Sequence, residues 1–142
     1  MEEYGLVKIR VENSRSRSGK HAFRAIAVIV NDGKLELVDV DRVPGTLVKP
    51  RYVKGVAKIA NLKLPKDSYV VLLELVKNPR NKVKGVVRVL DSDGNEKLRL
   101  KYINGVVRRS RGASELGSIA LKALEFLRIP YHRVNLRTGV NT

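Results

Sequence analysis

Short runs in which apolar and charged residues alternate constrain the fold of this chain more than any other feature. Residues 97–102 read KLRLKY and residues 6–12 read LVKIRVE. A period of two places alternate side chains on opposite faces, as in a strand with one buried face. The turn-forming run 91–95 (DSDGN) separates the strand at 97–103 from an apolar run at 85–90. The pattern therefore predicts a β-hairpin and, more widely, an antiparallel sheet.

Further strands are expected earlier in the chain. The run 22–30 is almost wholly apolar, a turn (NDG) follows at 31–33, and 35–43 returns as a strand. Together with 6–12, these runs predict a three-stranded antiparallel meander. Residues 69–76 (YVVLLELV) are typical of a buried strand. Residues 50–62 stay open between helix and strand, because helical spacing of apolar residues competes with Gly55 and β-branched content.

One segment has the pattern of an amphipathic helix. Residues 114–128 place one apolar stripe on a helix, made of Leu116, Ile119, Ala120, Ala123 and Leu127. We expect Ser114 to cap this helix and Pro130 to bar its continuation. The predicted class is α+β. It comprises an antiparallel sheet of about five to six short strands with two hairpins, packed by one C-terminal helix and possibly a second helix at 50–62.

Length and composition exclude several classes of protein. A chain of 142 residues fits a single domain, here 1–142, with a flexible basic loop at 13–21 and a basic tail at 131–142. The absence of cysteine excludes disulfides and thiolate metal sites. No apolar run reaches the roughly 18 residues of a membrane span, and the acidic start is unlike a signal peptide. We therefore expect a cytoplasmic protein without membrane contact.

The net charge is the strongest functional signal. Lys and Arg number 29 against 14 Asp and Glu, which gives +15 and a pI near 10.4. The excess is uneven, since residues 1–43 carry 8 basic and 7 acidic residues while 44–142 carry 21 and 7. An uncompensated positive excess repels itself and suits a polyanionic partner. The Lys-, Arg- and Val-rich composition without cysteine is also typical of a thermophile.

Basic side chains gather at outward strand positions and in three loops. Alternation puts the cations of 97–101 on one strand face, and the strand register decides whether Arg88 joins them from the partner strand. The basic loops are 15–20, 80–84 and 108–112, and the tail adds further cations. The candidate nucleic-acid-binding residues are Lys8, Arg10, Arg15, Arg17, Lys20, Arg80, Lys82, Lys84, Arg88, Lys97, Arg99, Lys101, Arg108, Arg109, Arg111, Arg133 and Arg137.

The tightest phosphate site is expected where the helix begins. Arg108, Arg109 and Arg111 come just before it, and amides at a helix N-terminus favour an anion. Guanidinium groups could chelate the same phosphate. Broad base stacking is not expected, because the chain has five Tyr, two Phe and no Trp. Of the tyrosines, Tyr102 and Tyr52 are assigned to the core.

Catalysis has little support in the sequence. His21 and His132 lie far apart and are flanked by basic residues. The run 91–95 resembles part of a calcium loop but lacks the downstream acid, and a hairpin explains it better. A metal-dependent nuclease would need clustered carboxylates, for which only Glu12, Glu74 and Glu115 are candidates. We therefore expect no catalytic residue, no metal and no cofactor.

The reading that follows is a non-catalytic protein that binds structured RNA through its phosphates, as a ribosomal or other ribonucleoprotein component. RNA is favoured over DNA because basic loops around a small sheet suit folded RNA and no recognition helix is evident. A DNA-binding or chromatin-associated protein is the alternative. Less favoured are the nuclease and a scaffold subunit whose basic face docks an acidic protein. The oligomeric state is left open.

Overall fold

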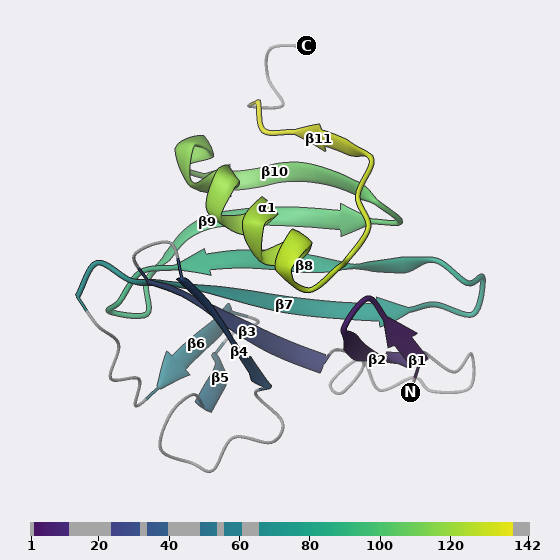
Figure 1. Ribbon diagram of the computed structural model, residues 1–142, viewed down its shortest axis with the longest axis horizontal. Helices are drawn as coiled ribbons and strands as arrows, with labels where there is room; N and C mark the ends of the chain where they lie inside the picture. The colour runs from purple at the N-terminus through teal and green to yellow at the C-terminus, as the bar shows by residue number, and fades with distance from the viewer. Residues whose placement is uncertain are drawn as a thin grey trace.

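The computed structural model describes residues 2–11, 24–31, 34–39, 49–53, 56–60 and 66–137, and Figure 1 shows their arrangement. Its strands are β1 (Glu2–Tyr4), β2 (Val7–Val11), β3 (Arg24–Asn31), β4 (Lys34–Asp39), β5 (Lys49–Val53), β6 (Val56–Ala60), β7 (Tyr69–Lys77), β8 (Val83–Leu90), β9 (Glu96–Ile103), β10 (Val106–Gly112) and β11 (Arg133–Asn135). A 3-10 helix, η2 (Ser114–Leu116), leads into the α-helix α1 (Gly117–Phe126).

The main sheet is built around five antiparallel strands in the order β3–β7–β8–β9–β10. The shorter strands β1, β2, β4 and β11 extend it, and β5 and β6 pair separately as a hairpin. The helix α1 lies over one face of the sheet, in front of β8 and β9 in Figure 1. The predicted α+β class, an antiparallel sheet with one C-terminal helix, is therefore confirmed.

The hydrophobic core lies between α1 and the sheet. Ala123 and Leu124 of the helix are fully buried against sheet residues such as Leu73, Leu100 and Tyr102. Full burial of one large apolar side chain contributes about 1.5–3 kcal/mol, so this layer dominates the stability of the domain. The core assignment of Tyr102 is thus confirmed, whereas the side chain of Tyr52 lies outside the part that the structure describes.

The Tyr102 hydroxyl links three distant segments. It donates a hydrogen bond to the Pro130 carbonyl and shares another with the hydroxyl of Tyr4. Burial of the ring, together with the bond to Tyr4, raises the pKa of Tyr102 well above its ordinary value. The phenol is therefore neutral, and it ties β1 and the segment after α1 to strand β9.

Strand β7 is buried on both faces along most of its length. Val71 and Leu73 face the helix, while Val70 and Leu72 are equally buried on the other side.

Strand β7 also explains why the predicted three-stranded meander is wrong. β3 pairs with residues 69–75 of β7, and β2 pairs in parallel with residues 76–77 at the same edge. The expected strands 6–12 and 22–30 therefore lie end to end along β7, because a long apolar strand outcompetes their mutual pairing.

The other hairpin predictions are confirmed. β8 and β9 pair antiparallel on either side of residues 91–95. β3 and β4 pair antiparallel around the expected turn at 31–33, although 40–43 of the predicted strand lies outside the described residues. The segment left open at 50–62 contains the two strands β5 and β6, so the possible second helix is absent there. Local alternation and cross-strand pairing prevail over the helical spacing of its apolar residues.

Two expectations about the residues before the helix are wrong. The predicted basic loop 108–112 is part of strand β10, which pairs with β9 and contains a bulge between Arg109 and Arg111. The bulge shifts the alternation by one residue and hides the strand pattern. Ser114 does not cap the helix either. It is the first residue of η2, whose N-cap is Ala113, and no side-chain hydrogen bond caps this turn.

Candidate nucleic-acid interface

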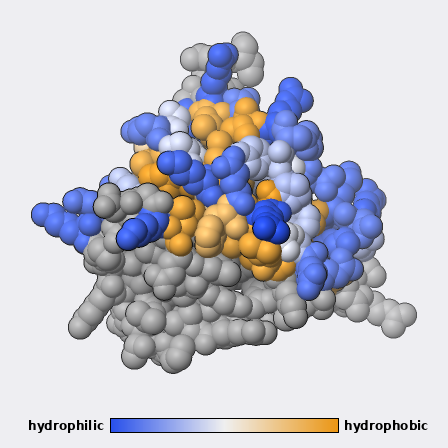
Figure 2. Space-filling model, viewed as in Figure 1, coloured by the Kyte–Doolittle hydropathy of each residue, from blue (hydrophilic) through white to orange (hydrophobic). Residues whose placement is uncertain are grey.

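The strands β8 to β11 present one face to the core and the other away from α1. In β9, Leu98, Leu100 and Tyr102 are buried toward the helix, so Lys101 and Ile103 point to the opposite side. The expected separation of apolar and basic faces on this strand is therefore confirmed. Figure 2 shows the helix side of the molecule, where hydrophilic side chains surround exposed hydrophobic ones. The opposite sheet face, which carries Lys101 and Ile103, is not seen in this view.

The backbone register places a first row of side chains across this far face. Lys84 of β8 lies opposite Ile103 of β9, Ile103 opposite Val106 of β10, and Val106 beside Arg133 of β11. The row thus has two apolar residues at its centre and one cation at each end. With strands spaced about 4.8 Å apart, it spans about 14 Å at the backbone. Lys84, Ile103 and Arg133 are exposed, and Ile103 retains 53% of its surface.

A second row runs parallel to the first, two residues away along each strand. It joins Val86, Lys101, Arg108 and Asn135, again as register partners across β8 to β11. Lys101 lies directly opposite Arg108, an arrangement that is destabilising unless an anion compensates the two charges. We call the two rows together the basic face.

Among the described residues, the cations of the basic face lack a carboxylate counter-ion. Across the residues that the structure describes, no carboxylate forms an ion pair with any of the following four cations: Lys84, Lys101, Arg108 and Arg133. All four are exposed. They are among the residues that the sequence predicted to bind nucleic acid, and the fold brings them together on one surface.

Three other candidate arginines are engaged with carboxylates in the next part of the same sheet face. We call the group Glu74, Arg88, Glu96, Arg99 and Arg111 the arginine cluster. Glu96 accepts from Arg99 Nε at 2.9 Å and from Arg111 Nη2 at 2.6 Å, while Arg88 Nε lies 3.1 Å from it. Arg88 also forms an ion pair with Glu74, and both side chains are almost fully buried.

Glu96 is the anionic centre of the arginine cluster. Burial raises the pKa of its carboxyl, but the hydrogen bonds from Arg99 and Arg111 outweigh that effect and lower the pKa below its ordinary value. Glu96 is therefore charged at neutral pH. The register places Arg88 opposite Arg99, so Arg88 joins the strand cations on their sheet face as expected, but its side chain is buried there against Glu74. Alternation alone could not show this, because it assigns a face and not what covers that face.

In the hairpin turn at 91–95, the carboxylate of Asp91 accepts hydrogen bonds from the backbone of the turn itself. Asp91 Oδ1 accepts from the backbone amides of Asp93 and Asn95 at 3.0 and 2.9 Å. Burial raises the pKa of Asp91, but these bonds and the charge of Lys97 lower it overall. Lys97 Nζ lies 3.7 Å from Asp91 Oδ2, so this candidate has a partner at the hairpin. The hairpin interpretation of the calcium-like sequence is confirmed.

The three arginines before the helix do not converge. Arg109 lies opposite Leu100 and therefore on the other face of β10 from Arg108. Its guanidinium donates to the Gly112 carbonyl at 2.6 Å, while Arg111 is bound to Glu96. The start of α1 is also covered, because Leu136 packs against Gly117. The three guanidinium groups therefore do not form the phosphate site that was expected at the start of the helix.

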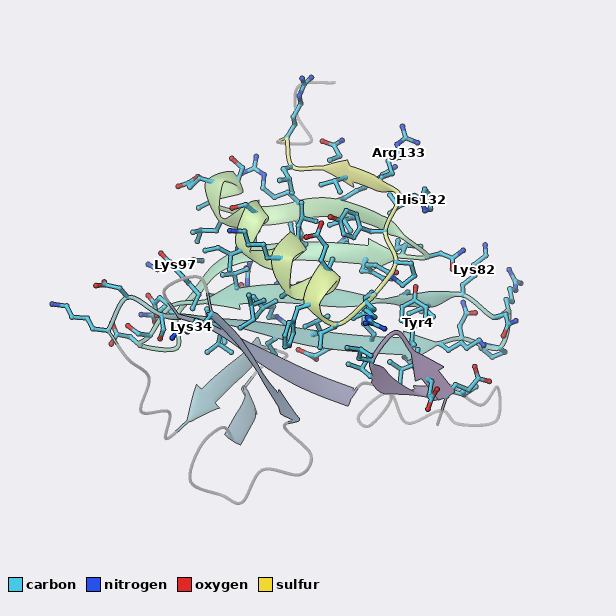
Figure 3. All side chains as sticks on the ribbon, in the orientation of Figure 1. Tyr4, Lys34, Lys82, Lys97, His132 and Arg133 are labelled. Atoms are coloured by element: carbon cyan, nitrogen blue, oxygen red, sulfur yellow. The ribbon has the colours of Figure 1, made fainter. Side chains whose placement is uncertain are left out.

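The remaining described candidates lie at the rim of the sheet. Arg80 and Lys82 are exposed on the turn between β7 and β8, where both backbone amides donate to Asn78 Oδ1. Figure 3 shows Lys82, His132 and Arg133 at one end of the sheet and Lys97 at the other. Arg137 is exposed just after β11. The turn therefore extends the positive surface beside the first row, whereas Arg137 lies two residues beyond Asn135 of the second row.

Seven of the residues singled out in the sequence have side chains outside the part of the chain that the structure describes. Arg15, Arg17 and Lys20 lie outside the described residues, and so do Glu12 and His21. Lys8 and Arg10 belong to β2, but their side chains lie outside the described part. The contribution of the loop 13–21 to binding stays a prediction.

The apolar centre of the basic face, Ile103 and Val106, was not predicted from the sequence. Ile103 continues the outward phase of Lys97, Arg99 and Lys101, so alternation alone could have identified it as an exposed apolar residue. Val106 and Asn135 could not be found in this way, because β11 has only three residues and β10 is interrupted by a bulge.

The described part of the chain offers no obvious centre for metal chemistry. Among those residues, no group of three or more His, Asp or Glu side chains is placed to hold a metal ion. Glu74 is paired with Arg88, and Glu115 is exposed on η2. Among the same residues, no helix has the length and apolar character needed to cross a membrane.

The chain was compared with protein-family models, with curated proteins and with solved structures, and none of the three comparisons gave a match.

Proposed function

We propose that the protein is a non-catalytic RNA-binding protein, a ribosomal or other ribonucleoprotein component of the cytoplasm that holds structured RNA by its phosphates. One observation carries the proposal. Lys84, Lys101, Arg108 and Arg133 share one exposed sheet face without a carboxylate partner among the described residues. A polyanion would relieve the repulsion between Lys101 and Arg108.

The arginine cluster supports this choice of surface. Where Arg99 and Arg111 approach each other in the same sheet, the carboxylate of Glu96 lies between them and accepts hydrogen bonds from both. Among the described residues, no such carboxylate pairs with the cations of the basic face, so their charge is available to a ligand. Lys and Arg side chains that neutralise phosphates supply most of the affinity for nucleic acid, largely independent of sequence.

RNA is favoured over duplex DNA by the form of the surface. A major-groove reader needs a projecting helix with polar side chains for base edges. α1 instead packs its apolar stripe on the sheet, and Lys122 is its one cation. A flat sheet face lined with cations suits the backbone of folded RNA. Other ribonucleoprotein subunits are the expected additional partners.

The test is to purify the protein without nuclease treatment and to sequence the nucleic acid that remains bound. Ribosomal or other structured RNA is the expected result. Genomic DNA fragments would instead favour a DNA-binding or chromatin-associated role. If no nucleic acid remains at moderate salt and none rebinds at low salt, the proposal is wrong and docking of an acidic protein becomes the better account.

A further inference from the structure

We propose that the basic face receives an unpaired, single-stranded segment of RNA, with nucleobases over Ile103 and Val106 and phosphates on the surrounding cations. This inference rests on the proposed function and specifies the form of RNA that the face accepts. It comes from the first row of the basic face, in which two apolar side chains lie between Lys84 and Arg133.

The apolar centre is the feature that a purely electrostatic surface does not require. Ile103 keeps 53% of its surface exposed, and among the large apolar residues that the structure describes only Leu6, at 56%, is more exposed. A side chain of this size at the middle of a cationic face gains free energy only if a ligand covers it with apolar surface. Neither water nor a phosphate can do so.

Duplex nucleic acid does not offer such a surface. Its bases are stacked and paired inside, and double-stranded RNA is contacted through phosphates and 2′-hydroxyls. An unpaired segment exposes the faces of its bases together with its phosphates. It can therefore cover Ile103 and Val106 while its backbone reaches the cations at both ends of the row.

The second row fits the same ligand. Lys101 is two residues from Ile103 in β9, and Arg108 is two residues from Val106 in β10, so all four side chains lie on the same face. A strand that crosses the first row thus has two further cations beside it. Asn135, at the end of the second row, is exposed, and its Oδ1 accepts a hydrogen bond from the backbone amide of Arg137 at 3.0 Å. Its side-chain NH2 group can donate to a base or a 2′-hydroxyl.

An acidic polypeptide is the competing ligand. Its carboxylates would match the cations, but Asp and Glu side chains offer little apolar surface for Ile103. The single strand is preferred because it satisfies the charges and the apolar centre together.

The experiment compares two RNA probes by fluorescence anisotropy: an unstructured labelled 12-nucleotide RNA and the same strand annealed to its complement. The wild-type protein should bind the single strand about tenfold more tightly at equal salt. Ile103→Thr keeps a β-branched side chain but makes its surface polar. It should weaken single-strand binding about fivefold, the effect of losing roughly one methylene-sized contact or slightly more, and leave duplex binding within twofold.

Val134→Thr is the matched control. Val134 lies in β11 beside Val107, on the opposite face from Arg133, and is also exposed. It should bind both probes like the wild type. A thermal melt checks that each variant is folded. If Ile103→Thr does not fold, the milder Ile103→Val variant replaces it, and its affinity for the single strand should fall about twofold. The inference is then judged from this loss and from the preference of the wild-type protein for the single strand.

The outcomes separate this inference from the proposed function. Equal binding of duplex and single strand, or equal effects of Ile103→Thr and Val134→Thr, would overturn the single-strand inference and leave phosphate binding intact. If neither probe binds at low salt while poly-glutamate does, the proposed function fails as well. A single-strand preference that Ile103→Thr abolishes would support both.

Discussion

At the scale of single residues, a cation's availability to a ligand depends more on whether a carboxylate lies beside it than on its position in the strand. Arg99 and Lys101 occupy equivalent outward positions in β9, yet Arg99 is bound to Glu96 and Lys101 faces no acid in the described structure. The local sequence cannot distinguish them, because Glu96 reaches Arg111 and Arg88 only after β8, β9 and β10 are aligned. The outward faces were thus predictable, whereas the subset of unpaired cations was not.

Arg88 gives the clearest test at this scale. Arg88→Met should destabilise the protein by about 3–5 kcal/mol, because it leaves the buried carboxylate of Glu74 without its partner. The double variant Glu74→Leu with Arg88→Met should recover most of that loss. Urea unfolding measures both effects. The RNA affinity of the folded protein should be unchanged, and a weaker affinity in the double variant with intact stability would return Arg88 to the binding surface.

Glu96 predicts a dependence of stability on pH. Because the folded state lowers the pKa of Glu96 below its ordinary value of 4.5, the carboxylate stabilises the fold at neutral pH. That contribution is lost as the pH falls through the lowered pKa. Glu96→Gln should therefore reduce the free energy of unfolding by about 1–3 kcal/mol at pH 7, the scale of charged hydrogen bonds. The gap to the wild type should close in acid; a constant gap from pH 7 to strongly acidic solution would refute this role.

At the scale of elements, strands with clean alternation and the one amphipathic helix were predictable from local pattern. The pairing of strands was not, because β2 and β3 share one edge of β7 and the pattern of each strand says nothing about its neighbour. β10 was taken as a loop because three arginines and a bulge obscure its period. The site depends on this element, since β10 carries Arg108 and Val106 into the basic face.

Gly112 tests how the end of β10 is fixed. Its φ of 100° is a left-handed conformation, and a Cβ atom there would lie 2.2 Å from the Lys97 carbonyl oxygen of β9. Gly112→Ala should cost about 2 kcal/mol or more, since backbone strain and the clash act together. Ser110→Ala, in the exposed bulge of the same strand, should cost less than about 0.5 kcal/mol. Similar urea midpoints for the two variants would contradict this account of the strand end.

At the scale of the whole molecule, seven of the 29 Lys and Arg residues lie in two parts of one sheet face. The three arginines of the arginine cluster are paired with Glu74 and Glu96, whereas the four cations of the basic face have no carboxylate partner among the described residues. The net charge of +15 pointed to a polyanion from the sequence alone. Where that polyanion would bind followed only from the register of β8 to β11.

The salt dependence of RNA binding tests the central claim most directly. For a single-stranded probe, the slope of log K against log salt is about −0.7 for each phosphate neutralised. Replacing Lys101 and Arg108 together with Ser should therefore flatten the slope by about 1.4 and weaken binding at low salt. The control is Lys66→Ser with Lys122→Ser, which removes the same charge from two exposed positions outside the basic face. We predict that the control keeps the wild-type slope and affinity. Equal slopes for both double variants would contradict the assignment of phosphate binding to the basic face.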